Sequence, residues 1–204
     1  MEGVPSDHAV ARPLSSTTSA IDHGKGGEGG KGGVSSEVRA ENQRSCMDRT
    51  ALFSPCRTFR YRLGRRWSEG PVLAFIMLNP SCADEHIDDP SVRRCIGFAR
   101  RLGYGALEVV NLYAFLATDP AELRRAGYPV GPGNDQQITE AVHESSRVVA
   151  AWGVHAARLG RPKEVLGLLS GLGATPYCLR VTCSGHPEHP LRLPSSCDLR
   201  PFQG

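Results

Sequence analysis

Features that mark membrane and secreted proteins are missing from this chain of 204 residues. No apolar run approaches the roughly 18 residues that a membrane-spanning helix needs. The amino terminus lacks a basic segment followed by an apolar stretch, which is the pattern of a signal peptide. We therefore expect a cytoplasmic location and no membrane partner.

The cysteines do not form a metal-binding or disulfide pattern. There are seven of them, none in a Cys-x-x-Cys pair, and the nearest two are Cys178 and Cys183. That spacing is too wide for the usual zinc hairpin, and small disulfide-rich folds belong to secreted proteins. The sequence predicts reduced thiols, no metal site and no cofactor.

The glycine-rich run at 24–33 lacks what a phosphate loop requires. Lys25 stands where the first glycine belongs, Gly32 follows Lys31 in place of Ser or Thr, and no strand precedes the run. Residues 1–46 contain little apolar clustering, so they cannot offset the entropy of ordering. We expect a disordered tail over 1–46 and one α/β domain over 47–204.

The net charge of +3 does not by itself indicate nucleic-acid binding. Arginines are nevertheless clustered in two stretches, 57–66 and 93–101. Such clusters fit phosphate contacts, and they fit solvated surfaces equally well. Both interpretations stay open at the level of sequence.

Apolar runs of strand length alternate with helical segments in the second half of the chain. A half-exposed antiparallel strand is expected at 57–67, with Gly64 near a bulge or turn. Buried strands are expected at 72–78, 107–112, 147–152 and 177–181. Helices are expected at 90–102, 120–125, 134–144 and 155–171. Asp89 is the expected N-cap of the first and Asn134 that of the third. The last helix is expected to be interrupted at Pro162. This order predicts a three-layer α/β/α fold with a central, mostly parallel four-stranded sheet, preceded by an antiparallel hairpin.

Polar residues stand at the ends of these apolar runs. They are Asn79, Asn111, the pair Trp152 and Gly153, and the loop that contains His186 and His189. In an open parallel sheet, ligands bind outside the carboxyl ends of the strands, so these side chains are expected to meet in one crevice. Asparagine also suits turns, and a loop with two His-Pro pairs is stable on hydrogen bonds alone, so a structural role is the alternative.

A polar cluster of Asp84, Glu85, His86, Asp88 and Asp89 follows the first of these motifs. Oxygen and imidazole groups this dense suit a divalent metal. Capping of the following helix explains the last two aspartates at least as well, and we therefore expect no metal.

The motifs together resemble a bacterial family of proteins of unknown function, the domain-of-unknown-function 1643 family. The likeness covers about residues 50–201. It rests on Ser54-Pro55-Cys56, Leu78-Asn79-Pro80-Ser81, Asp89-Pro90, Arg93-Arg94-Cys95, Asn111-Leu112, Asn134-Asp135, Ala151-Trp152-Gly153 and Gly185-His186-Pro187 through His189-Pro190-Leu191.

The same order of motifs is similar, more distantly, to the uracil-DNA glycosylase-like superfamily. That resemblance implies that Asn79, with Pro80 and Ser81 beside it, holds the attacking water and that Asn111 reads the base. It also implies that a histidine stabilises the departing base and that Leu191 is a wedge into nucleic acid. Either His186 or His189 matches the family histidine, and Gly185 favours His186 because it lets the backbone approach a ligand.

The resemblance implies a glycosylase-like hydrolase that cleaves the N-glycosidic bond of a nucleobase in DNA or a nucleotide. The chemistry needs a placed water, a stabiliser for the leaving base and access to the base. Asn79 is not a base, so it would orient water without deprotonating it. The alternative is a non-catalytic domain that binds nucleic acid or nucleotide in the same crevice.

Overall fold

A computed structural model describes residues 47–204, and the predicted disordered tail lies outside the described residues. The strands are β1 (Asp48–Phe53), β2 (Arg60–Arg66), β3 (Val72–Met77), β4 (Ala106–Asn111), β5 (Arg147–Ala150), β6 (Pro176–Cys178) and β7 (Arg200–Pro201). The helices are α1 (Pro90–Arg101), α2 (Pro120–Arg125), α3 (Asn134–Glu144) and α4 (Arg161–Gly171), with short 3₁₀ turns η1 (Val154–Ala156) and η2 (Pro190–Arg192).

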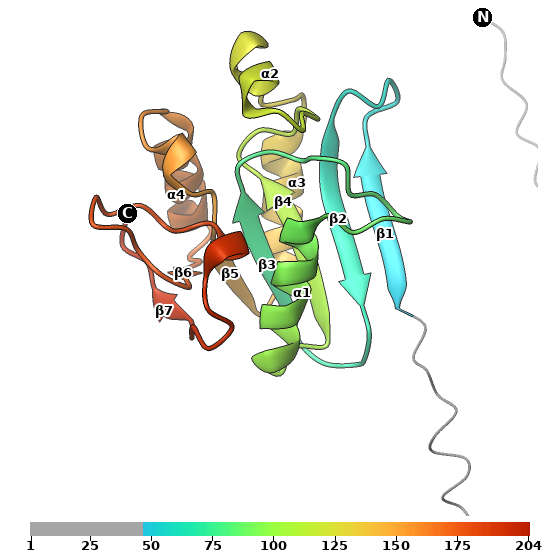
Figure 1. Ribbon diagram of the computed structural model, residues 1–204, viewed down its shortest axis with the longest axis vertical. Coiled ribbons are helices and arrows are strands. Elements are labelled where there is room, and N and C mark those ends of the chain that lie inside the picture. Colours follow the sequence, from blue (N-terminus) through green and yellow to red (C-terminus); the bar gives the residue numbers. More distant parts are fainter. Residues whose placement is uncertain (1–46) are drawn as a thin grey trace, which may run out of the picture. The chain divides into compact units, whose positions relative to one another are not determined.

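The strands form one seven-stranded sheet in the order β1-β2-β4-β3-β5-β6-β7 (Figure 1). Strands β4, β3, β5 and β6 pair in parallel, whereas the β1–β2, β2–β4 and β6–β7 pairs are antiparallel. The chain is thus a mixed α/β protein, as expected. The expected four-stranded sheet is corrected to seven strands, because β2 of the preceding hairpin pairs with β4 and β7 pairs with β6.

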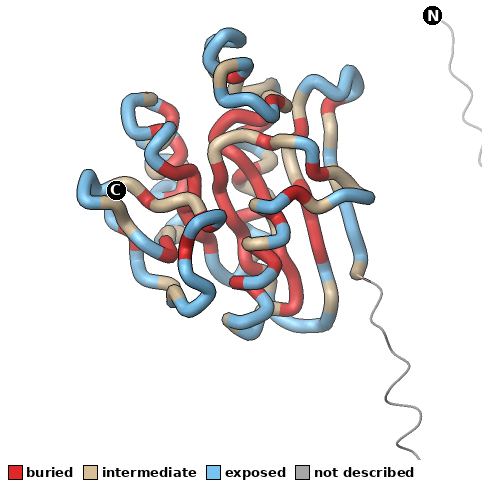
Figure 2. The backbone as a smooth tube through the Cα atoms, in the orientation of Figure 1, coloured by how far each residue is buried: buried red, intermediate tan, exposed pale blue. Residues whose placement is uncertain are grey.

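Helices cover both faces of the sheet because the side chains of each strand alternate between two apolar clusters. Leu73, Phe75 and Met77 of β3 pack with the apolar face of α1. Ala74 and Ile76 of the same strand pack with residues of α3 and α4. The central strands are therefore almost wholly buried, whereas β1 is largely exposed (Figure 2). No helix within residues 47–204 is long and apolar enough to cross a bilayer.

Several helix ends follow from the sequence as expected. Asp89 caps α1 by accepting the Val92 N–H at 2.8 Å, and Pro90 occupies the first turn. Asp119 caps α2 by accepting the Ala121 N–H at 2.8 Å. The expected interruption at Pro162 is wrong, since Pro162 lies in the first turn of α4, where its missing N–H costs nothing.

Strand β2 departs furthest from its expected half-exposed pattern. Arg60 and Arg65 are 2% and 1% exposed. Arg65 is buried because it donates to Asp88 at 2.8 Å and to the Gly64 carbonyl at 2.7 Å. Gly64 pairs regularly with Thr50 and Glu108, and the irregularity in the β1–β2 pairing lies between Leu52 and Phe53 instead.

Candidate functional site

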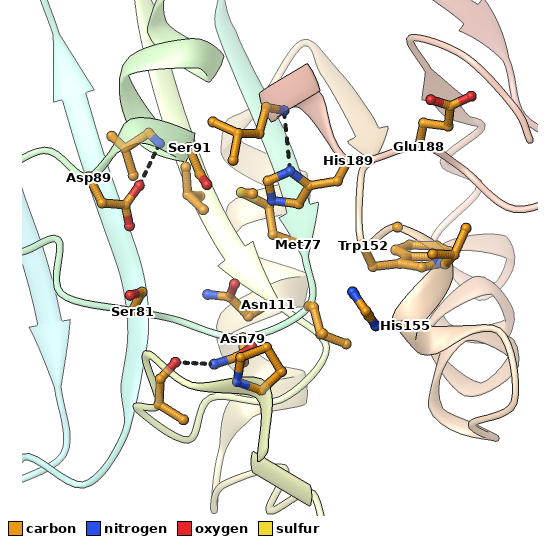
Figure 3. Close-up of a pocket in the computed structure, with 18 of the residues that line it drawn as sticks. Met77, Asn79, Ser81, Asp89, Ser91, Asn111, Trp152, His155, Glu188 and His189 are labelled. Atoms are coloured by element: carbon orange, nitrogen blue, oxygen red, sulfur yellow. Dashed lines mark hydrogen bonds between the residues drawn. The ribbon is translucent and has the colours of Figure 1, made fainter. Parts of the chain in front are cut away.

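A cavity of about 520 Å³ opens at the carboxyl edge of the parallel strands, a size typical of small-molecule sites. Its walls come from the segments that follow β3, β4 and β5, from the first turn of α1 and from the chain around η2 (Figure 3). The predicted site residues that line it are Asn79, Ser81, Asn111, Trp152, Gly153, His189 and Leu191. Pro80 and His186 are not part of its lining.

Asn111 is the last residue of β4 and forms part of the cavity floor, close to Met77 (Figure 3). Its side chain is 1% exposed, and neither its Oδ1 nor its Nδ2 has a hydrogen-bond partner among the described residues. A buried polar group without a partner costs about 1–3 kcal/mol. Both unpaired groups belong to a residue that lines the cavity, so a ligand is one source of the two missing partners.

Asn134 holds the end of β4 and is not the helix cap that the sequence predicts. Gly133 takes the cap position with a φ of 78°, and Asn134 is the first residue of α3. Its Nδ2 donates to the carbonyls of Asn111 and Leu112 at 3.0 and 3.2 Å. Arg161 donates from Nε to the same Leu112 carbonyl at 3.0 Å. These contacts fix the backbone from which the Asn111 side chain projects.

His189 lies in the cavity with a defined tautomer. Its Nδ1 accepts the Leu191 N–H at 3.2 Å, so the ring proton of the neutral imidazole lies on Nε2. Burial lowers the pKa of His189 below its usual value, although Asp89 opposes the shift. The imidazole is therefore neutral at pH 7 and offers one N–H donor.

Gly153 places the histidine loop against the end of β5. Its N–H donates to the Pro187 carbonyl at 3.0 Å, and its φ of 74° with ψ of −178° is a conformation reserved for glycine. A Cβ at this position would lie 3.2 Å from the Cβ of His189. Glycine is thus required both for the backbone shape and for the close approach of the loop.

The side chain of Asn79 is fixed because its amide nitrogen donates to two backbone carbonyls. Nδ2 donates to the carbonyls of Pro80 and Ala117 at 2.9 and 2.8 Å, which orients Oδ1 as the remaining acceptor. Pro80 thus acts through its carbonyl without lining the cavity. Ser81 donates to the Thr118 hydroxyl at 3.3 Å on the same side of the opening.

Two buried charged residues that the sequence did not place in the site, Arg60 and Asp89, also line the cavity. Asp89 is 8% exposed, and while one carboxylate oxygen caps α1, the other accepts no hydrogen bond from residues 47–204. Arg60 donates to the Ala83 carbonyl, and its buried Nε is unpaired within the same range. Burial lowers the pKa of Arg60 to about 10, with Asp89 opposing the shift, so the guanidinium stays charged.

His186, the histidine preferred from the sequence because it follows Gly185, lies in a turn and does not line the cavity. His186 donates its N–H to the Thr182 hydroxyl at 3.1 Å, and its carbonyl accepts the Thr182 N–H at 2.9 Å. The preference for His186 over His189 is therefore not supported by the geometry. Leu191 is 44% exposed at the cavity, whereas Trp152 is 2% exposed and packs edge-on against Phe202.

Two aspartates of the polar cluster 84–89, Asp84 and Asp88, are engaged in structural contacts. Asp84 accepts the N–H groups of His86 and Ile87, each at 2.7 Å, and Asp88 pairs with Arg65 at 2.8 Å. Over residues 47–204 there is no group of three or more acidic, histidine or cysteine side chains arranged to hold a metal ion.

Most of the clustered arginines also have partners within the fold. Arg62 pairs with Glu108 at 2.8 Å, Arg101 pairs with Asp198 at 2.9 Å, and Arg94 bonds the Leu193 carbonyl. Their spacing in the sequence thus reflects packing of β2 and α1 against neighbouring segments, and it gives no support to a row of phosphate contacts.

The fold and the cavity define a mixed α/β protein with a small-molecule-sized site at the carboxyl edge of its parallel strands. A family model described as a protein of unknown function, DUF1643, matches residues 60–191, and the chain belongs to this family. Neither the curated proteins nor the solved structures contain a match to the chain. The matched range includes every residue that lines the cavity except Arg192.

Sequence reasoning missed Arg60 and Asp89 as cavity residues for different reasons. Asp89 was accounted for by its capping role, which uses only one of its two oxygens. Arg60 is the first residue of β2, on the polar side of an alternating pattern, where arginine normally points to water. The signal for its burial is the antiparallel pairing of β2 with β4, which brings the start of β2 beside the carboxyl end of β4, and that pairing is not readable from a local pattern.

Proposed function

We propose that the cavity binds a nucleobase of a nucleotide or of DNA, and that the protein hydrolyses its N-glycosidic bond in the manner of a glycosylase. The observation that carries the proposal is the buried, unpaired amide of Asn111 on the cavity floor. Most buried polar side chains in proteins have partners. One without them in a site of this size is best explained by a ligand.

An amide is suited to a base edge because it offers a donor and an acceptor side by side. A pyrimidine or purine presents a matching acceptor and donor on its Watson–Crick edge. Asn134 bonds the Asn111 carbonyl and Arg161 bonds the next carbonyl, that of Leu112, so the backbone at Asn111 is held in place. A base entering the cavity would meet an amide whose position is set in advance.

Hydrolysis would use the two neighbouring polar groups. A water held by the free Oδ1 of Asn79 would attack the anomeric carbon of the sugar, and the glycosidic bonding electrons would leave with the base. The Nε2–H of His189 would donate to the base carbonyl where negative charge develops. Because burial lowers the His189 pKa, the ring is neutral, and its single proton on Nε2 is available for this hydrogen bond. The water's protons end on the released sugar and base.

Apolar side chains at the opening suit a substrate that arrives on a polymer. Leu191 and Val154 both line the cavity and are 44% and 52% exposed. Exposed apolar groups beside a base pocket can fill the space that an extruded base leaves in a stack.

Non-catalytic binding in the same cavity is the second candidate, and one observation favours it. The Asn79 amide is fixed on two carbonyls and cannot take a proton from water. A domain with only this group near the attacking position would bind a base without turning it over.

An assay for released base on nucleosides and on single- and double-stranded DNA carrying uracil or hypoxanthine tests the proposal. We expect product from the wild type, strongly reduced turnover with retained binding in Asn79→Ala, and loss of both in Asn111→Leu. Gln136→Ala, on the exposed face of α3, serves as the control and should behave as the wild type. Binding without product would select the second candidate, and neither binding nor product on any substrate would refute the proposal.

A further inference from the structure

One wall of the cavity carries two buried charges that do not pair with each other. Arg60 and Asp89 are 2% and 8% exposed, and both line the cavity. They are close enough for Asp89 to influence the pKa of Arg60, yet no ion pair joins them or joins either to another side chain among residues 47–204. Burying an unpaired charge is costly, so a bound partner is expected to contact this wall.

The opposite signs of the two groups restrict what that partner can be. A phosphate drawn to Arg60 would be repelled by Asp89, and an ammonium drawn to Asp89 would be repelled by Arg60. A neutral group that both donates and accepts hydrogen bonds suits both charges at once. The hydroxyl is the simplest such group, because its hydrogen can bond a carboxylate while its lone pairs accept from a guanidinium.

Further polar groups extend the same wall. Ser91 follows Asp89 in the first turn of α1, Ser81 lies below Asp89, and both line the cavity (Figure 3). Asn111 lines the same cavity. We take a ligand with its base at Asn111 to direct its sugar toward Asp89, since both residues line this cavity.

We propose that Arg60 and Asp89 form a sugar-hydroxyl subsite, and that the protein selects ribonucleosides or ribonucleotides over their 2′-deoxy counterparts. The inference rests on the proposed function, because it takes the base to lie at Asn111. Of the two substrates proposed there, it favours a ribonucleotide over DNA. Carboxylates bind ribose hydroxyls in other nucleotide sites for the same reason, since an ionised acceptor strengthens the bond.

The variant Asp89→Ser separates the subsite from the helix cap. Serine caps a helix as well as aspartate does, so α1 should remain intact, but serine lacks the second oxygen that faces the cavity. Asp119→Ser is the matched control, because Asp119 also caps a helix, α2, and is not part of the cavity lining.

The test is isothermal titration of the full chain with inosine, 2′-deoxyinosine and hypoxanthine, and with uridine, 2′-deoxyuridine and uracil. The wild type should bind at least one ribonucleoside about tenfold or more tightly than its 2′-deoxy form, as expected for one charge-assisted hydrogen bond. The preference should shrink to about twofold or less in Asp89→Ser. It should persist in Asp119→Ser.

Three outcomes would overturn the inference. Equal affinity for ribonucleosides and their 2′-deoxy forms would refute the sugar subsite, and so would a preference that survives Asp89→Ser. In either case the proposed base binding would stand if affinity is still lost in Asn111→Leu. If none of the six probes binds the wild type, the inference falls, and the proposed function is then decided by the assay on DNA.

Discussion

Replacing Asn111 with leucine should make the free protein more stable while it abolishes base binding. Leucine has the same branching as asparagine but no polar atoms. The wild-type side chain is 1% exposed with an unpaired donor and an unpaired acceptor, so its removal relieves a desolvation cost. The expected gain is about 1–3 kcal/mol. For a domain of this size, that corresponds to a rise in Tm of about 2–4 °C per kcal/mol.

Asn134→Leu is the matched control, because Asn134 is also 1% exposed but its amide donates to the carbonyls of Asn111 and Leu112. Leucine there removes the Asn134 donor from the Asn111 carbonyl, whereas the Leu112 carbonyl keeps the Arg161 donor. It also removes the buried, unpaired Oδ1 of Asn134, which offsets part of the loss. We expect a loss of about 1–3 kcal/mol, opposite in sign to the effect at Asn111.

Both variants are compared with the wild type by urea unfolding and by thermal melts, with and without nucleoside. The wild type should melt higher in the presence of a ligand, whereas Asn111→Leu should start higher and show no shift. An Asn111→Leu protein that is less stable than the wild type would refute the reasoning, since it would mean that the amide has a structural partner within the fold.

Three further predictions concern the residues around Asn111. Gly153→Ala should cost about 1–3 kcal/mol in urea unfolding, because alanine is strained at this φ and its Cβ crowds His189; an unchanged midpoint would contradict this. The folded pKa of His189 lies below its unfolded value of about 6.5, so the stability it contributes is present above that pH and is lost as the pH falls through the folded pKa. Unfolding midpoints measured from neutral to acidic pH should fall in the wild type. The fall should be smaller in His189→Gln, because that variant lacks the contribution of His189. Asn79→Asp should lower both stability and turnover, since a carboxylate would face the carbonyls of Pro80 and Ala117; an increase in released base would contradict that expectation.

The parts of the fold that local sequence patterns control were predictable. Asp89 and Asp119 cap their helices because an aspartate before proline satisfies the first N–H groups. The buried strands follow from continuous apolar runs, and their parallel pairing brings Met77 opposite Asn111 at the edge where polar residues were expected.

The remaining features depend on contacts between distant segments. The pairing of β2 with β4 buries Arg60 and makes the hairpin part of the sheet, and no short pattern reports it. Asparagine is a residue type that commonly caps helices. Asn134 instead bonds the end of β4, because Gly133 occupies the cap position of α3. The choice between His186 and His189 depends on the loop path past Gly153, which is set by tertiary packing.

The central claim is that Asn111 pairs with a base edge, and a crystal structure of the protein soaked with inosine or uridine tests it most directly. The account predicts a base in the cavity with hydrogen bonds of about 2.7–3.2 Å to both Oδ1 and Nδ2 of Asn111. A nucleoside bound elsewhere, or one bound in the cavity that leaves the Asn111 amide unpaired, would contradict it.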